Sequence, residues 1–185
     1  MVSNNLKKMI FGCNSLTTFS SKNKAIELIN IAIENEVINF DTAPTYGMGY
    51  SEIILGEALK GNKDIKIATK FGNKRSPITL LPSNIAFRIN SLKKIIRNQN
   101  IKKVNKPSNH FHEINFINKD KYIKQLISSY QKSHKRLKKQ NVEVLMIHML
   151  DPFFLDSKIG ENITLSIKSG DLPKMGYSGP INRKF

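Results

Sequence analysis

Short apolar runs alternate with helical patterns along most of this chain, and that alternation limits the folds it can adopt. The runs predict strands at residues 7–12, 37–41, 65–70, 142–148 and 173–179. Amphipathic patterns between them predict helices at residues 24–36, 51–60, 121–139 and 156–170. Ser51 is a suitable N-cap for the second of these helices, and Gly170 is a suitable stop for the fourth. Strands separated by helices predict an α/β fold with a parallel sheet covered by helices.

A doubly wound sheet and a barrel both obey this alternation. The first strand is not followed by a G-x-G-x-x-G motif, which counts against a doubly wound dinucleotide-binding fold. Residues 74–118 form a long irregular stretch after the third strand, so we expect an insertion that passes over the mouth of a barrel. The length of 185 residues predicts a single domain over residues 1–185.

Three of the predicted strands end in a polar residue. These residues are Asp41, Lys70 and His148, and Tyr46 follows shortly after the first of them. In a parallel barrel the carboxyl ends of all strands open on the same face, where active sites lie. We therefore expect Asp41, Lys70 and His148 to converge, with Tyr46 held over them by the loop that follows the second strand.

This set of side chains suits proton transfer to a carbonyl oxygen. A tyrosine is a weak acid, and a neighbouring ammonium group stabilises its phenolate. Lys70 can supply that charge, Asp41 can orient Lys70, and His148 can hydrogen-bond the substrate oxygen. We expect hydride to reach the carbon of an aldehyde or ketone while Tyr46 protonates the oxygen. Each residue alone could be a turn former or a solvated side chain, but four on one predicted face favour a catalytic role.

The segments NFDTAPTYGMGYSEIILGEAL, IATKFG, SHKRLKKQNVEVLMIH and GDLPKMGYSG together resemble the aldo-keto reductase family. The resemblance implies a TIM-type (β/α)8 barrel and an oxidoreductase that uses NADP(H) to reduce an aldehyde or ketone, possible substrates including sugars. It implies Asp41, Tyr46, Lys70 and His148 as the catalytic residues, with Tyr46 as the general acid. It also places Asp41 and Ser178 at the cofactor, Ser178 against the nicotinamide amide.

A complete barrel of this type has eight strands, and the sequence predicts five. We therefore expect a domain that is truncated at its C-terminus, with two open sheet edges. Such edges predict self-association or a partner chain. An alternative is a catalytically inactive barrel fragment that serves as an interaction module.

The formal net charge of +16 leaves a polyanion-binding protein as another alternative. However, Ile, Asn and Lys are enriched together along the chain, which indicates a general compositional bias. The densest basic run, residues 132–139, lacks the aromatic residues of a single-stranded nucleic-acid platform and is typical of a solvated helix end. Nucleic acid is therefore not expected as a partner.

Membrane association and a bound metal are not expected either. The chain has no apolar run that approaches a membrane span, and its single cysteine fits a reducing compartment, so we expect a cytoplasmic protein. His110 and His112, with Glu113 beside them, could bind a metal, but the sequence offers them no clear further ligand.

Overall fold

The computed structural model describes residues 7–72, 119–148 and 157–179, and within them five strands form one parallel sheet in the order β1-β2-β3-β4-β5. The strands are β1 (Ile10–Gly12), β2 (Asn39–Asp41), β3 (Lys66–Phe71), β4 (Val142–His148) and β5 (Lys174–Ser178). All five predicted strands are present, and the predicted parallel α/β sheet is confirmed. Among the strands, the largest shift of a boundary is at β1, which begins at Ile10 instead of residue 7.

Within the described residues four α-helices accompany the strands, as the sequence predicts. They are α2 (Lys22–Glu34), α3 (Tyr50–Ala58), α5 (Lys119–Arg136) and α6 (Ser157–Lys168). α2 begins two residues earlier than expected because the Ser21 hydroxyl caps it, accepting a hydrogen bond from the Lys24 amide at 3.3 Å. Gly170 has a φ of +83° after α6, which confirms it as the stop.

Ser51 does not cap α3, so that prediction is wrong. The residue at the N-cap is Gly49, whose φ of +90° suits glycine. Ser51 is buried inside the helix, where its hydroxyl donates to the Cys13 carbonyl at 2.8 Å and lies 3.0 Å from the Thr42 hydroxyl. The Ser51 hydroxyl is therefore engaged by these buried partners and does not cap the helix.

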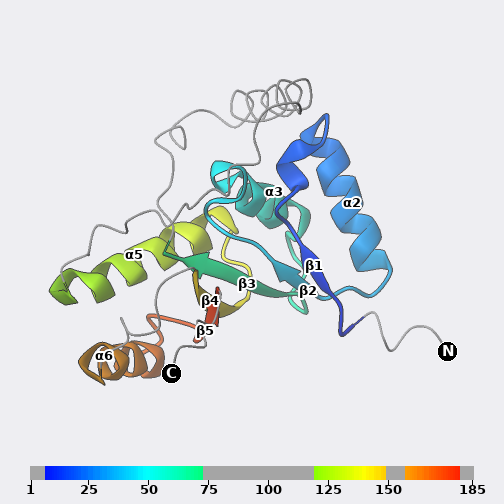
Figure 1. Cartoon of the computed structure of the whole chain (residues 1–185). Coiled ribbons are helices and arrows are strands. Elements are labelled where there is room, and N and C mark those ends of the chain that lie inside the picture. Colours follow the sequence, from blue (N-terminus) through cyan, green and yellow to red (C-terminus); the bar gives the residue numbers. More distant parts are fainter. Residues whose placement is uncertain (1–6, 73–118, 149–156, 180–185) are drawn as a thin grey trace, which may run out of the picture.

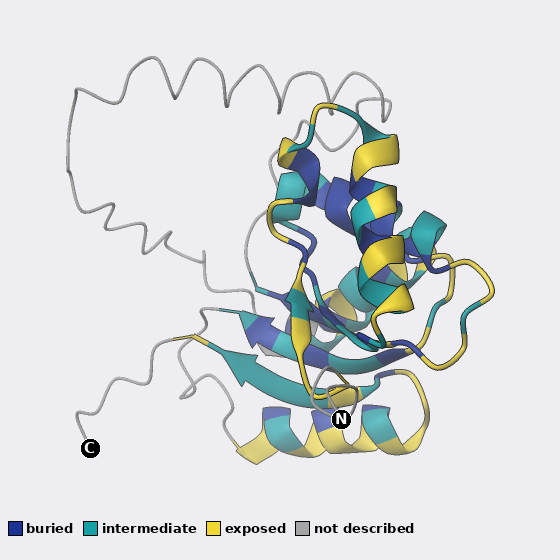
Figure 2. Ribbon diagram, turned by 90° about the vertical axis from the view of Figure 1, so that its right-hand side faces the viewer, coloured by how far each residue is buried: buried dark blue, intermediate teal, exposed yellow. Residues whose placement is uncertain are grey.

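The helices surround the outside of the curved sheet (Figure 1). Two apolar clusters fill the space between helices and strands. One joins β1, β2 and β3 to α2 and α3, and includes Phe40, Ile54 and Ile67; the other joins β3, β4 and β5 to α5 and α6, and includes Leu126 and Leu145. Because α6 packs on the sheet, its buried positions are turned to the sheet and its exposed positions are turned away (Figure 2).

The described sheet does not close on itself, so β1 and β5 are its edge strands. Ile10 in β1 is 68% exposed and Met9 before it is 53% exposed, so apolar side chains lie at this edge. Self-association through such an edge stays a prediction. The predicted insertion at residues 74–118, with His110, His112 and Glu113, lies outside the described residues. Among the described helices, none combines the length and apolar character that a membrane span requires.

The contact between α3 and the end of α5 leaves no room for a side chain at Gly56. A Cβ atom placed there would lie 2.7 Å from the Arg136 carbonyl oxygen and 2.8 Å from the Leu137 Cα. Both are backbone atoms, which cannot move without displacing the end of α5. The close approach of the two helices therefore depends on this glycine.

We expect Gly56→Ala to lower the free energy of unfolding by about 2 kcal/mol, since the added methyl overpacks a contact between two backbones. The matched control is Gly160→Ala in α6, where an added Cβ would meet no atom within 4 Å. That control should be neutral or stabilising by about 0.5 kcal/mol, because alanine favours helix. Urea unfolding followed by circular dichroism checks both. Equal stability of the two variants would contradict the packing at Gly56.

Candidate active site

Strand register brings three of the predicted site residues to one rim of the sheet. Asp41 is the last residue of β2, Lys70 lies near the end of β3, and His148 is the last residue of β4. Tyr46 begins the short 3-10 helix η2 (Tyr46–Gly49), which follows β2 and leads directly into α3. The structure thus places the four residues in neighbouring elements at the carboxyl end of the strands.

Lys70 is the central group of this rim. Its side chain is only 5% exposed, and its Nζ donates to Asp41 Oδ1 at 2.5 Å and to the Thr42 carbonyl at 2.9 Å. Its Nζ also lies 4.9 Å from the centre of the Tyr46 ring. A buried ammonium needs such partners because an unpaired charge away from water is costly. The predicted contacts of Lys70 with Asp41 and Tyr46 are therefore present.

The turn that carries Tyr46 depends on its glycines. Gly47, Met48 and Gly49 all have a positive φ, of +53°, +60° and +90°. A Cβ atom at Gly47 would also overlap the Thr17 side chain from η1 (Leu16–Thr18). The sequence YGMGY therefore sets the path of the chain at the point where Tyr46 meets Lys70.

His148 stands in an environment that favours its neutral form. Burial lowers the pKa of His148 below its ordinary value of 6.5, and the Lys70 charge lowers it further, while Asp41 acts in the opposite direction. A neutral imidazole has one donor and one acceptor nitrogen. His148 can therefore hydrogen-bond a carbonyl or hydroxyl oxygen without carrying a charge of its own at neutral pH.

Ser178 ends β5 at the same rim, directly across from His148 in the β4–β5 register. It is half-buried, and Gly179 after it is exposed. Cys13, just beyond β1, is fully buried, and its thiol contacts the Phe11 carbonyl. Burial raises the pKa of Cys13 far above its ordinary range, so the thiol stays protonated and does not act as a nucleophile.

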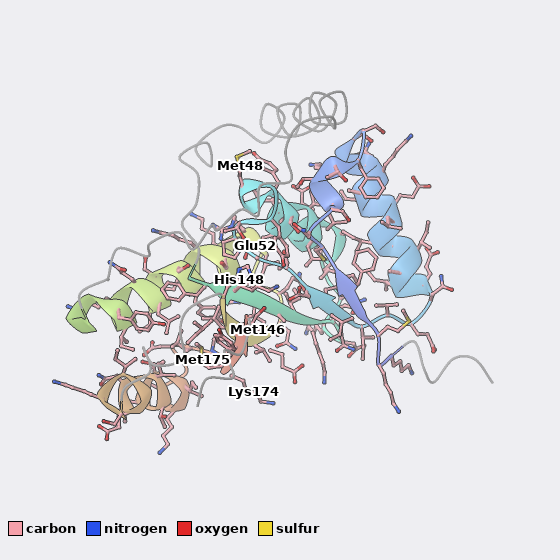
Figure 3. All side chains as sticks on the ribbon, viewed as in Figure 1. Met48, Glu52, Met146, His148, Lys174 and Met175 are labelled. Carbon is pink, nitrogen blue, oxygen red and sulfur yellow. The ribbon has the colours of Figure 1, made fainter. Side chains whose placement is uncertain are left out.

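Glu52 is a functional candidate that the sequence reasoning missed. Its side chain is fully buried within α3 and accepts hydrogen bonds from the Thr69 hydroxyl at 2.7 Å and from Arg136 Nε at 2.5 Å. Arg136 also donates to the Ser133 hydroxyl at 3.0 Å. Figure 3 shows Glu52, like His148, toward the middle of the fold. Glu52 thereby links the helix that follows Tyr46 to the residue that precedes Lys70.

The signal for this buried charge was available in the helical spacing. Glu52 shares one face of α3 with Leu55, three positions later, and Leu59 at the C-cap continues that face; both leucines are fully buried. Its partner Arg136 lies in the basic run at residues 132–139. The prediction of a solvated helix end for this run is therefore partly wrong, since Arg136 forms this ion pair and Ser133 and Leu137 are buried.

A cavity of about 390 Å³ adjoins the rim. Lys70 and His148 line it together with Pro44 and Thr45 from the turn after β2, and α5 forms another of its walls. A small organic molecule fits a cavity of this size. A molecule in the cavity would contact Lys70 and His148 directly and would lie beside the turn that leads to Tyr46.

Comparisons with known proteins identify the family of this chain. A model of the aldo/keto reductase family matches residues 8–180. The chain belongs to the aldo/keto reductase family. It is 44% identical to the uncharacterized oxidoreductase YqkF of Bacillus subtilis (strain 168) over 64 residues, which cover 34% of this chain and 20% of that relative.

Solved structures of aldo/keto reductases have a similar fold. The holo form of AKR11C1 from Bacillus halodurans superposes with a TM-score of 0.59 at 21% identity, covering 92% of this chain and 45% of that one. The glycerol dehydrogenase AKR11B4 from Gluconobacter oxydans gives a TM-score of 0.59 at 17% identity, covering 94% and 45%. This family member thus spans about half the length of these solved structures.

The electrostatic coupling at the site can be tested by titrating the His148 imidazole in NMR spectra. We expect Lys70→Met to raise the pKa of His148, because it removes a neighbouring positive charge, and Asp41→Asn to lower it, because it removes a negative one. Lys66→Met, at the opposite end of β3, is the control and should leave the titration unchanged.

The lowered pKa of His148 in the folded protein also predicts that the free energy of unfolding depends on pH. Because the folded-state pKa of His148 lies below its unfolded value, the stability from the neutral imidazole is full above about pH 6.5 and is lost as the pH falls through the folded pKa.

For the NMR titration, a His148 pKa that did not respond to Lys70→Met, or that moved upward in Asp41→Asn, would contradict the arrangement of charges.

Proposed function

We propose that this chain is an NADP(H)-dependent carbonyl reductase that converts an aldehyde or ketone to an alcohol, with Tyr46 as the general acid. The observation that carries the proposal is the buried Lys70 ammonium, which is ion-paired with Asp41 and lies 4.9 Å from the Tyr46 ring centre. Membership of the aldo/keto reductase family supports the same reaction class. The cavity lined by Lys70 and His148 offers space for a small substrate, and sugars are among the carbonyl compounds of suitable size.

In this mechanism the residues of the chain transfer one proton to the substrate oxygen. As negative charge develops on the carbonyl oxygen, the Tyr46 hydroxyl gives its proton to that oxygen, and the resulting phenolate is stabilised by the Lys70 ammonium. Asp41 and the Thr42 carbonyl keep Lys70 charged and fixed in place. Neutral His148 donates a hydrogen bond to the substrate oxygen and so orients the carbonyl group.

The rim also offers groups suited to a nicotinamide cofactor, which supplies the hydride when it is bound. Ser178 places a hydroxyl at the end of β5, one strand from His148, where it can donate to or accept from a carboxamide. Asp41 is 27% exposed despite its ion pair, so one edge of its carboxylate remains accessible. We propose that these two residues contact the nicotinamide end of NADP(H).

The location of the protein and its alternative functions are two further expectations from the sequence. The cytoplasmic location, proposed from the single cysteine, remains a proposal. The inactive-fragment and polyanion-binding alternatives are not favoured. Lys70 is ion-paired with Asp41 and lies 4.9 Å from the Tyr46 ring centre, and the dense basic run includes an arginine, Arg136, that is paired with Glu52.

We expect Tyr46→Phe to lower the rate of NADPH-dependent aldehyde reduction at least about a hundredfold, the scale for loss of a general acid. Tyr130→Phe on α5 makes the same chemical change away from the rim and should retain nearly full activity. The assay follows NADPH oxidation by the 185-residue chain with small aldehydes, and unfolding curves establish that both variants are folded.

Near-normal turnover by Tyr46→Phe would rule out the role of Tyr46. Absence of reduction by the wild-type chain across aldehydes and ketones would contradict the proposed function itself. The dissociation constant of NADPH should be similar in Tyr46→Phe and wild type, because the phenol acts on the substrate oxygen.

A further inference from the structure

The wall that α5 contributes to the cavity is polar and basic. Five of its residues line the space: Lys124, Gln125, Ser128, Ser129 and Lys132. Their spacing of four and eight positions places Lys124, Ser128 and Lys132 along one side of the helix. The two lysines are about 12 Å apart along the axis, at 1.5 Å per residue, and the serines lie between them.

The charges of Lys124 and Lys132 are not compensated within the described part of the site. The described residues that line the cavity include no carboxylate. None of the ion pairs formed between described residues uses either lysine. Lys70 differs, since Asp41 neutralises it at 2.5 Å. The α5 wall therefore presents positive charge to whatever occupies the cavity.

From this arrangement we propose that the α5 wall binds an anionic group, a carboxylate or a phosphate, of the carbonyl substrate. Lys124 and Lys132 would pair with the anion, and the Ser128 and Ser129 hydroxyls would donate to its oxygens. Charged hydrogen bonds to an oxyanion are stronger than those between neutral groups, so they offset the loss of water from the anion. This inference rests on the proposed carbonyl reductase function and names the substrate class for the same cavity.

The proposal also predicts how the substrate is oriented. The carbonyl end must reach His148 at the end of β4 and Tyr46 at the start of η2, while the anionic end remains at α5. A neutral, largely apolar carbonyl compound would leave the lysines and serines of α5 without partners. The wall therefore favours a bifunctional substrate over a simple aliphatic aldehyde.

The first experiment measures anion binding without any reaction. Isothermal titration calorimetry with succinate and with inorganic phosphate compares wild type, Lys124→Gln/Lys132→Gln and the control Lys24→Gln/Lys135→Gln. Both double variants lose two exposed lysine charges, but only the first changes the cavity. We expect affinity for one or both anions to fall at least about tenfold in the cavity variant and less than about twofold in the control. The anion that binds more tightly identifies the group as carboxylate or phosphate.

An equal loss of affinity in the two double variants would overturn the proposal, because net charge and not the cavity would then bind the anion. So would an unchanged affinity in the cavity variant, or no binding of either anion to the wild-type chain. Because these measurements need no turnover, they hold even if the chain reduces no carbonyl compound.

The second experiment tests whether the anion belongs to the substrate. Succinic semialdehyde and glyceraldehyde 3-phosphate are compared with their neutral counterparts butyraldehyde and glyceraldehyde. In Lys124→Gln/Lys132→Gln the KM for an anionic aldehyde should rise about tenfold, while the KM for its neutral counterpart and the Kd of NADPH change less than about twofold. A rise in the Kd of NADPH instead would assign the lysines to the cofactor and overturn the proposal. Equal KM changes for anionic and neutral aldehydes would overturn it while leaving the reductase function intact.

Discussion

The arrangement of the candidate site depends on the buried carboxylate of Glu52. This side chain lies on the first turns of α3, immediately after the turn that carries Tyr46, and it accepts hydrogen bonds from Thr69 on β3 and Arg136 at the end of α5. Removing one partner of such a buried pair leaves a charge without compensation, so the three elements are held together as a unit. Lys70 follows Thr69 directly, and α5 forms a wall of the cavity. One ion pair thereby links the positions of Tyr46, the Lys70 ammonium and the proposed substrate wall.

The second constraint is the placement of a single buried positive charge. Asp41 and the Thr42 carbonyl hold the Lys70 ammonium, and that ammonium in turn lies near Tyr46 and helps to lower the pKa of His148. The rim thus combines a charged lysine with a neutral imidazole. Proton donation by a tyrosine benefits from the first, and hydrogen bonding to a substrate oxygen benefits from the second. The burial of Cys13 beside the same charges keeps its thiol protonated and inert.

Much of this could be predicted from the sequence because parallel strands bring their carboxyl ends to one rim. The polar residues Asp41, Lys70 and His148 could therefore be grouped without knowing any distance. The buried contacts that compete with local signals could not be predicted in the same way: Ser51 has the side chain of an N-cap, but its hydroxyl bonds to the Cys13 carbonyl. Arg136 lies among exposed lysines in the sequence, and only the packing of α5 on α3 at Gly56 reveals that it is paired with Glu52. The α5 wall was missed because Lys124 and Lys132 acquire a common role only when that helix borders the cavity.

Through its contacts with Thr69 and Arg136, Glu52 couples the turn of Tyr46, the end of β3 and the end of α5. Amide hydrogen exchange of wild type and Glu52→Gln, followed residue by residue, tests it directly, since glutamine keeps the volume but removes the charge. We expect faster exchange in Glu52→Gln at Tyr46–Tyr50, at Thr69–Phe71 and at the last turn of α5 together, with α6 and β5 unchanged. Faster exchange confined to α3, or a uniform increase over the described residues, would show that Glu52 does not couple these elements.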